Sequence, residues 1–200
     1  MEDINYRNTH YVMGAAKVKQ LPEDAGVEIA FAGRSNSGKS STVNFLTDQK
    51  KLAKISKQPG HTRLINIFQV TDDVKLVDLP GYGYAKVPKS MKEEWQKTLT
   101  HYLQSRQCLH GIVLVMDIRH PMTEFDINMI DWCIESQLPV HILLNKSDKL
   151  NNHDKLTVFR QLKEEFDAHE GDVTIQLFST LKKEGLPILQ RKLAEWINKG

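Results

Sequence analysis

Short apolar, β-branched runs alternate along the chain with longer amphipathic segments, and this alternation limits the possible folds more than any other feature. The expected strands are Val27–Ala32, Leu64–Val70, Val74–Val77, Gly111–Met116, Val140–Leu144 and Val173–Phe178. The expected helices are Lys39–Thr47, Ser90–Gln104, Glu124–Ser136, Lys155–His169 and Leu186–Asn198. Strands that alternate with helices predict an α/β fold, in which helices cover both faces of a mostly parallel sheet.

One pair of strands departs from this pattern. Only Thr71, Asp72 and Asp73 separate Leu64–Val70 from Val74–Val77, which suits a hairpin but is too short for a parallel crossover. We therefore expect a six-stranded, mostly parallel sheet with one antiparallel edge strand. Residues 27–200 are expected to form one domain, and residues 1–26 an N-terminal extension that packs on it with little regular structure.

The composition is typical of a soluble single-domain protein. A chain of 200 residues can bury a core without disulfides or a structural metal, and two cysteines are too few for a disulfide framework. The longest apolar runs are far shorter than the ~20 residues that span a bilayer. The first residues lack the basic and apolar segments of a signal peptide. We expect a cytoplasmic protein that contacts no membrane.

The formal net charge of +2 hides an uneven distribution of charged residues. Basic residues predominate in 48–63, 86–106 and 182–199, whereas 117–135 and 164–172 are acidic. A surface made by the basic segments would suit the phosphates of RNA. The alternative is that these lysines are solvated and meet no partner.

A glycine-rich motif lies directly between the first expected strand and the first expected helix. It fits the pattern G-x-x-x-x-G-K-[ST], in the context that a phosphate-binding loop requires: Gly33-Arg34-Ser35-Asn36-Ser37-Gly38-Lys39-Ser40. The backbone N–H groups of such a loop point at a phosphate, Lys39 would reach the β- and γ-phosphates, and Ser40 would ligate Mg²⁺. An ordinary glycine-rich turn is the alternative.

A second motif, Asp78-Leu79-Pro80-Gly81, follows the strand after the glycine-rich unit. Its aspartate could hold Mg²⁺ through water, and the Gly81 N–H could sense the γ-phosphate. An ordinary β-turn is the alternative. The long polar stretch between the first helix and the second strand contains Thr62, whose hydroxyl would close onto Mg²⁺ only when the γ-phosphate is present. A surface loop remains compatible with that role.

Two further segments follow later strands and suit the recognition of a base. In Asn145-Lys146-Ser147-Asp148, the Asp148 carboxylate can accept from both N1–H and the N2 amine of guanine, whereas adenine offers no such donor pair. Asn145 could bond N7 or O6, and the Lys146 stem could pack along the base. In Phe178-Ser179-Thr180, backbone N–H groups could bond guanine O6, although a simple turn is the alternative.

These motifs together resemble those of the TrmE–Era–EngA–YihA–Septin group of small GTPases and, within it, the EngB (YihA/YsxC) family. The resemblance extends from about residue 5 to 196 and rests on residues 33–41, 59–63, 78–85, 117–120 and 179–183. Two residues depart from the family pattern: His61 replaces a more usual Arg or Lys, and Thr180 replaces a frequent Ser. Neither change removes a group that the chemistry needs.

The resemblance implies the three-layer fold of P-loop NTPases, specifically a small G domain. It also implies bacterial origin, binding of GTP and GDP with Mg²⁺, and a role in assembly of the large ribosomal subunit. Proteins of the family are needed for normal cell division and septation. Ribosomal RNA or a large-subunit precursor is the expected partner, and no DNA binding is expected.

The candidate site residues fall into three overlapping sets. The expected catalytic residues are Lys39, Thr62, Gly81 and Asn36. The expected Mg²⁺ ligands are Ser40, Thr62 and Asp78. The expected positions that bind GTP or GDP are Gly33, Arg34, Ser35, Asn36, Ser37, Gly38, Lys39, Ser40, Ser41, Gly60, His61, Thr62, Arg63, Leu64, Asp78, Leu79, Pro80, Gly81, Asn145, Lys146, Ser147, Asp148, Phe178, Ser179 and Thr180.

The residue after Gly81 is Tyr82, where Ras-like GTPases have a glutamine that orients the attacking water. Because tyrosine cannot orient a water in the same way, we expect slow intrinsic hydrolysis. In related GTPases an asparagine at the place of Asn36 helps to hold a K⁺ ion, so K⁺ is a candidate second cation. The alternative is that Asn36 only makes a hydrogen bond to the loop backbone.

Arg119 and His120 follow the fourth expected strand, close to Asp117 and Asp126. A structural network that caps the strand end explains them better than a catalytic histidine, because no nucleophile pairs with His120.

Two other functions compete with a GTP-hydrolysing switch on the ribosome. One is a guanine-nucleotide sensor that acts in cell division without ribosome binding. The other is a small-molecule kinase, which Asn145–Asp148 argues against.

Overall fold

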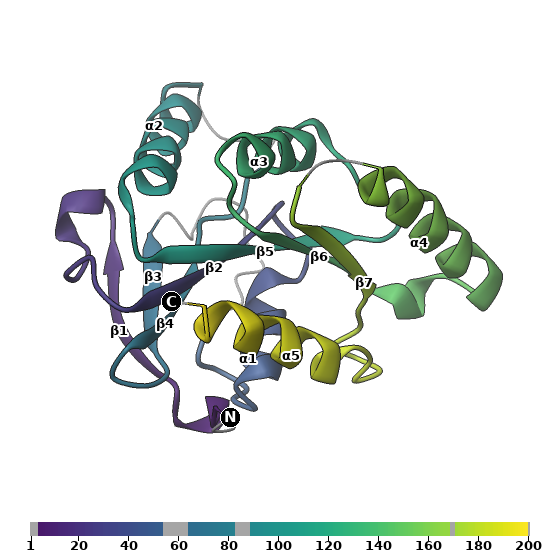
Figure 1. The fold of residues 1–200 in the computed structure, drawn as a ribbon, viewed down its shortest axis with the longest axis horizontal. Helices are drawn as coiled ribbons and strands as arrows, with labels where there is room; N and C mark the ends of the chain where they lie inside the picture. Colours follow the sequence, from purple (N-terminus) through teal and green to yellow (C-terminus); the bar gives the residue numbers. More distant parts are fainter. Residues whose placement is uncertain (1–3, 54–63, 83–88, 169–170, 200) are drawn as a thin grey trace.

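Within the residues that the computed structural model describes, seven strands form a single mixed sheet (Figure 1). The structure describes residues 4–53, 64–82, 89–168 and 171–199, of which 89–92 and 95 are described by their backbone alone. The strand order is β1-β3-β4-β2-β5-β6-β7. The strands are β1 (His10–Ala15), β2 (Val27–Gly33), β3 (Ile65–Gln69), β4 (Val74–Asp78), β5 (Leu109–Asp117), β6 (Val140–Asn145) and β7 (Val173–Leu177).

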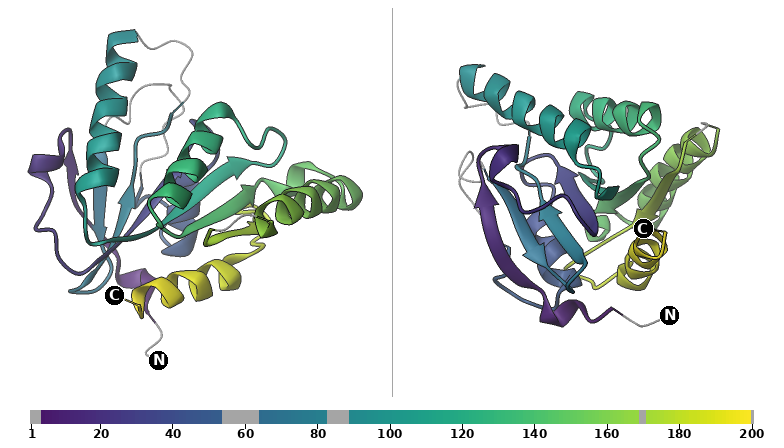
Figure 2. Two further views of the ribbon diagram at one scale, coloured as in Figure 1. Left: turned by 45° about the horizontal axis from the view of Figure 1, so that its top comes forward. Right: turned by 60° about the vertical axis from the view of Figure 1, so that its left-hand side comes forward.

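Helices cover both faces of the sheet, as the three-layer prediction requires. α2, α3 and α4 lie on one face, and α1 and α5 lie on the other (Figures 1 and 2). The helices are α1 (Lys39–Leu46), α2 (Lys89–Ser105), α3 (Glu124–Glu135), α4 (Asn152–Asp167) and α5 (Leu186–Ile197), and the short 3₁₀ turns are η1 (Tyr6–Asn8), η2 (Val18–Gln20) and η3 (Ser147–Lys149). The α/β fold class, the six expected strands and the five expected helices are confirmed, with ends that differ by up to a few residues.

The predicted number of strands is wrong by one. β1 comes from the segment expected to have little regular structure, and it pairs antiparallel with β3 at the outer edge of the sheet (Figure 2). The β3–β4 hairpin is antiparallel as predicted, but β3 is therefore not the edge strand. β1 escaped prediction because Tyr11 and Val12 are 51% and 43% exposed, so the strand lacks the buried apolar run that marks the others.

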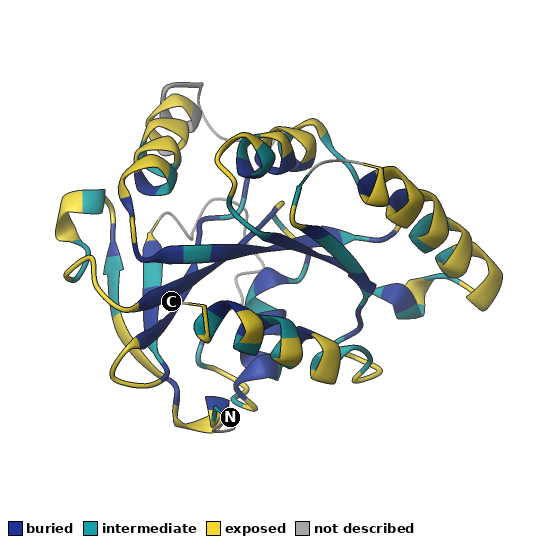
Figure 3. Cartoon of the chain, in the orientation of Figure 1, coloured by how far each residue is buried: buried dark blue, intermediate teal, exposed yellow. Residues whose placement is uncertain are grey.

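The apolar core has two parts, one on each face of the sheet (Figure 3). β5 contributes to both, because its side chains alternate between the two faces and nearly all of them are buried. Gly111 in β5 allows the Trp196 ring of α5 to pack directly against the strand: a Cβ there would be 2.5 Å from the ring. α5 therefore packs closely on β5 at the cost of one side chain in the strand.

A buried carboxylate lies at the start of β2. Glu28 is fully buried, accepts a hydrogen bond from the Tyr102 hydroxyl at 3.0 Å and forms an ion pair with Arg106. Burial, with the neighbouring Glu28 charge, raises the pKa of Tyr102 well above its ordinary value. The Arg106 guanidinium also donates to the Pro22 carbonyl oxygen at 2.9 Å, which attaches the N-terminal segment to the end of α2.

A second buried polar group joins β6 to β7. His141 is 3% exposed, and its two ring nitrogens lie 2.8 Å from Thr174 Oγ1 and from Gln176 Oε1. Burial lowers the pKa of His141 from 6.5 to about 4, and the charges of Lys192, Glu195 and Asp172 modify the shift. The imidazole is therefore neutral in the folded protein at pH 7.

We predict that His141 makes the fold sensitive to mild acid. The unfolded chain takes up a proton near pH 6.5 and the folded chain only near pH 4, so stability is full above pH 6.5 and falls as the pH falls toward 4. The shift corresponds to about 3 kcal/mol of unfolding free energy. Urea denaturation between pH 7.5 and 4 should show a smaller acid loss for His141→Gln than for wild type. The exposed His153→Gln is the control, and equal losses in all three proteins would contradict the assignment.

Candidate functional site

The carboxyl ends of the parallel strands meet at one edge of the sheet, and every predicted motif within the described residues lies there. β2 pairs in parallel with β4 and β5, and β6 pairs in parallel with β5 and β7 (Figure 1). The segments that follow β2, β4, β6 and β7 are therefore neighbours, although they are far apart in sequence. Ligands of open α/β sheets bind at this kind of edge.

The glycine-rich loop has the predicted strand–loop–helix context. β2 ends at Gly33, and α1 begins at Lys39 after Gly38, which has a φ of 97°. A Cβ at Gly38 would lie 2.2 Å from Asn145 Nδ2, so glycine is required by both the backbone conformation and the space available. The first N–H groups of α1 have no partner within the helix, which makes this turn suitable for an anion.

Lys39 and Asp78 form an ion pair at the centre of the site. The ammonium of Lys39 contacts the Asp78 carboxylate, and the two side chains are 7% and 2% exposed. Ser40 Oγ lies 3.4 Å from the other carboxylate oxygen of Asp78. The first turn of α1 and the end of β4 thus bring a cation, a carboxylate and a hydroxyl together, as the two motifs predicted.

The segment after β4 continues alongside the glycine-rich loop. Leu79 N–H donates to the Phe31 carbonyl at 3.0 Å, and Ser35 N–H donates to the Tyr82 carbonyl at 2.8 Å. Leu79 and Pro80 are buried and Gly81 is half-buried. The backbone of Asp78–Gly81 is therefore aligned with residues that should surround the phosphates.

The Tyr82 side chain points away from this loop and toward α3. Its ring stacks on Phe125 with the centroids 5.3 Å apart, and its hydroxyl donates to the Asp126 carboxylate. Asp126 also accepts from Thr123 N–H at 2.9 Å and from Thr123 Oγ1 at 2.7 Å, which caps the first turn of α3. Burial, together with Asp126, raises the pKa of Tyr82 well above its ordinary value, so the phenol stays protonated.

The loop after β6 is attached to the glycine-rich loop by two side chains. Asn145, 1% exposed, donates through Nδ2 to the Ser37 carbonyl at 2.8 Å. Lys146, which has a φ of 60°, donates through Nζ to the Asn36 carbonyl at 2.6 Å. The contact of Asn145 with the loop backbone is one that the sequence did not indicate.

Asp117, at the end of β5, holds two cations. It accepts from Lys146 Nζ at 2.8 Å and from Arg119 Nε and Nη2 at 2.9 and 2.7 Å. Burial opposes its ionisation, but the hydrogen bonds from Arg119 and Lys146 outweigh burial and hold the pKa of Asp117 well below its usual range. Arg119 thus belongs to a structural network, and the exposed His120 joins it through its backbone N–H, 2.9 Å from the Asp117 carbonyl.

Asp148 is fixed by the loop after β7. Its Oδ1 accepts from Ser179 Oγ at 2.5 Å, and its side chain is 6% exposed. Ser147 Oγ donates to Glu184 at 2.6 Å, and the backbones of Ser179 and Glu184 exchange two hydrogen bonds. Glu184 is a site residue that sequence reasoning missed, since a glutamate in a polar loop carries no signal of such a contact.

The remaining predicted positions are distributed as follows. Gly60, His61, Thr62 and Arg63 lie outside the described residues. Arg34 and Asn36 are exposed, Ser41 and Thr180 are half-buried, and Phe178 is fully buried. Leu64 is 39% exposed and lies beside Gly14 of β1.

In the described part of the chain, no helix is long and apolar enough to cross a bilayer.

Comparisons with known proteins agree with this arrangement. A model of the family described as 50S ribosome-binding GTPase matches residues 28–146. Proteins named probable GTP-binding protein EngB from Escherichia coli O157:H7 and Shigella flexneri are 50% identical over 198 residues, which covers 99% of this chain and 94% of each relative.

Solved structures show the same likeness. The crystal structure of a probable GTP-binding protein EngB superposes with a TM-score of 0.71 at 25% identity, over 87% of this chain and 100% of that one. NFeoB from S. thermophilus, bound to GDP·AlF₄⁻ and K⁺, gives 0.63 at 26% identity, over 85% of this chain and 62% of that one. The chain therefore belongs to the EngB family of GTP-binding proteins and is a GTPase.

Proposed function

We propose that this GTPase is a cytoplasmic switch that acts on precursors of the large ribosomal subunit and is needed for normal cell division and septation. The convergence of four motif-bearing segments at one sheet edge is the observation that carries its nucleotide chemistry. The ribosomal partner is supported by the matching family, which is described as 50S ribosome-binding. The proposed role in septation is supported by the family resemblance alone.

Asp148 is the proposed selector of guanine. Its carboxylate is nearly buried and is held by Ser179, and this fixed position supports a role in accepting from N1–H and the N2 amine. An adenine would add no donor to the one that Ser179 supplies, so the second carboxylate oxygen would be desolvated without a base donor in exchange, which is costly for a charge. The Lys146 stem spans from β6 to the glycine-rich loop, where it can lie along the base.

Lys39, Ser40 and Asp78 are the proposed residues for the phosphates and Mg²⁺. Magnesium prefers oxygen ligands and commonly uses one or two protein groups together with phosphate oxygens. The Asp78 carboxylate and the Ser40 hydroxyl, 3.4 Å apart, fit that preference, and Thr62 is the third proposed ligand. Bound Mg²⁺ would neutralise charge on the β- and γ-phosphates. Gly81 N–H would sense the γ-phosphate.

Slow intrinsic hydrolysis is expected because the Tyr82 side chain is bound at α3 and cannot orient a water near the phosphates. Asn36 is the proposed K⁺ residue: it is exposed, and its φ of 65° places it in a tight left-handed turn of the loop. A structural relative, NFeoB, was crystallised with GDP·AlF₄⁻ and K⁺. The K⁺ would do electrostatic work that an arginine supplies in other GTPases.

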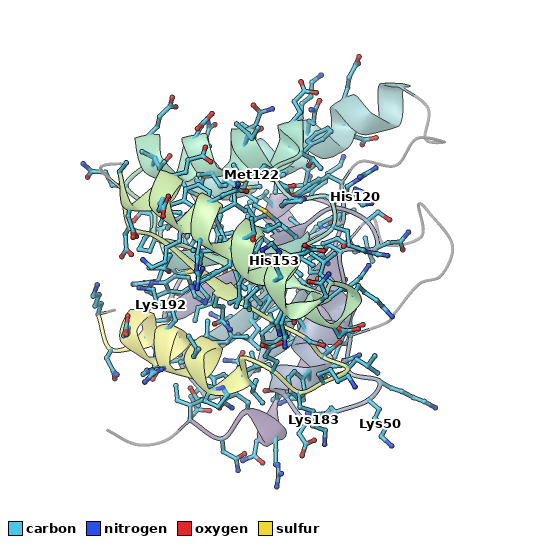
Figure 4. All side chains as sticks on the ribbon, turned by 90° about the vertical axis from the view of Figure 1, so that its right-hand side faces the viewer. Lys50, His120, Met122, His153, Lys183 and Lys192 are labelled. Carbon is cyan, nitrogen blue, oxygen red and sulfur yellow. The ribbon has the colours of Figure 1, made fainter. Side chains whose placement is uncertain are left out.

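Basic residues near the motif loops are the proposed contacts with ribosomal RNA. Lys50, in the loop after α1, and Lys183, in the loop after β7, both project outward in the view of Figure 4. Lys182 is exposed as well. Such groups would bind RNA phosphates with a strong dependence on salt.

Replacing Asp148 by asparagine should weaken GTP binding by at least about tenfold, because a charge-assisted pair of hydrogen bonds is lost. The same change should admit xanthosine nucleotides, whose base offers an acceptor where guanine has an amine. Isothermal titration with both nucleotides measures this. Asp72→Asn, an exposed change in the β3–β4 turn, is the control. An unchanged GTP affinity in the Asp148 variant would remove it from the guanine site.

GTP turnover should be several-fold faster in KCl than in NaCl at equal ionic strength. Asn36→Gly should abolish the difference while preserving the loop, because glycine readily adopts the left-handed conformation that Asn36 has. Phosphate release under multiple-turnover conditions is the measurement. Equal wild-type rates in the two salts would contradict the K⁺ proposal and leave Asn36 with only a structural role in the turn of the loop.

Purified 50S subunits should co-sediment with the protein in a non-hydrolysable GTP analogue and much less in GDP, and the binding should fall as KCl rises. The control is the Asp148→Asn variant without added nucleotide, which shows how much protein co-sediments when no nucleotide is bound. Equal co-sedimentation in both nucleotides would argue against a switch. No co-sedimentation in either would favour the alternative function, a guanine-nucleotide sensor that acts in cell division without the ribosome.

A further inference from the structure

A hollow of about 210 Å³ lies between α2 and α3, outside the nucleotide site. Each helix contributes four residues at positions i, i+3, i+4 and i+7, so each turns one continuous stripe toward the other. We call this hollow the α2–α3 groove. Its lining residues are Gln96, Leu99, Thr100 and Leu103 of α2, Phe125, Asn128, Met129 and Trp132 of α3, and Tyr82.

The groove has an apolar interior and a polar opening. None of its lining residues carries a charge at pH 7. Tyr82 and Met129 are buried, whereas Gln96, Thr100 and Asn128 are exposed. An apolar recess with a few uncharged polar groups at its mouth is the usual chemistry of a site for an apolar side chain.

The α3 side of the rim is acidic. α3 contains four carboxylates and neither lysine nor arginine. Three of them, Glu124, Asp131 and Glu135, are exposed and lie at i−4, i+3 and i+7 from Asn128, so they share the helix face of the residue at the groove's mouth. The outer surface of α3 is accordingly exposed along its length (Figure 3).

We propose that the α2–α3 groove docks a basic protein segment that inserts one large apolar side chain, and that this segment belongs to the large ribosomal subunit or its precursor. The carboxylates on α3 would attract lysines and arginines that flank the anchor, and they would repel the phosphates of RNA. A recess without charged groups offers no ion pair to a phosphate, and its apolar interior offers few hydrogen bonds to a sugar. The inference rests on the proposed ribosomal function and assigns the groove and its α3 side to protein, not to RNA; α2, on the other side, belongs to the basic segment 86–106.

The groove and the nucleotide site share one residue. Tyr82 lines the groove with its ring, while its carbonyl accepts from Ser35 N–H of the glycine-rich loop at 2.8 Å. It also directly follows Gly81, the proposed sensor of the γ-phosphate. A movement of Gly81 would therefore change the wall of the groove, which links docking to the bound nucleotide.

Charge reversal on α3 tests the proposal. We expect Asp131→Lys/Glu135→Lys to reduce co-sedimentation with 50S subunits at least fivefold in the GTP analogue, at unchanged GTP affinity. Glu164→Lys/Glu165→Lys makes the same charge change on exposed residues of α4 and is the matched control. If RNA contacts this face, the α3 variant should bind more tightly than the control. Tighter binding, or binding equal to the control, would overturn the proposal.

Cross-linking identifies the chemistry of the occupant. With p-benzoylphenylalanine in place of Asn128, irradiation on 50S subunits should attach the chain to a ribosomal protein at a basic segment. The same group in place of the exposed His153 of α4, labelled in Figure 4, is the control. Cross-links from position 128 to RNA alone, or to no protein, would overturn the inference while co-sedimentation still supported the proposed function. Absence of wild-type co-sedimentation would overturn the proposed function, and the inference with it.

Discussion

The hydrogen bond from Asn145 to the Ser37 carbonyl holds the two halves of the proposed nucleotide site together. It is buried, 2.8 Å long, and joins residues 108 positions apart. Removing one partner of such a bond costs about 1–3 kcal/mol, because the other is left buried without a partner. The bond requires that residue 38 have no side chain, since a Cβ there would lie 2.2 Å from the Asn145 amide. The proposed base-recognition loop and the glycine-rich loop thus keep a fixed separation, as one nucleotide bound to both would demand.

The cations of the site are paired with carboxylates of the chain. Lys39 is paired with Asp78, and Lys146 is paired with Asp117. A phosphate that takes Lys39 leaves the Asp78 carboxylate, 2% exposed, without its counter-charge. Leaving a buried charge alone is strongly unfavourable. In the proposed function, this ion pair would favour a phosphate that arrives together with a divalent cation over a phosphate alone, and it would link the two binding events.

Most of the fold followed from local patterns, and the failures have a physical cause. β5 and β6 were predictable because burial on both faces makes them continuous apolar runs. β1 was not, since an edge strand with exposed Tyr11 and Val12 shows no such run. The order of the motifs predicted that their loops would converge, because carboxyl ends of parallel strands share an edge.

What the sequence could not supply is contact between distant residues. Glu28 lies in a strand that otherwise reads as apolar, and its partner Arg106 is 78 residues away. Glu184, in the loop after β7, accepts a hydrogen bond from Ser147 in the loop after β6, and again no local pattern in the sequence indicates this contact. Such contacts depend on how the elements pack in space, and packing is not encoded in the spacing of residues within any one element.

Tyr82 shows how one side chain is committed to one of two tasks. A residue after Gly81 that orients a water must point into the site, whereas Tyr82 points to α3, stacks on Phe125 and binds Asp126. Its backbone remains paired with the glycine-rich loop. The chain thus gives up a water-orienting group and gains a rigid connection between the loop that would sense the γ-phosphate and a surface helix. The proposed slow hydrolysis and the proposed coupling to the α2–α3 groove would both follow from this one orientation, and a switch that must stay in its GTP form while a partner is engaged would need both.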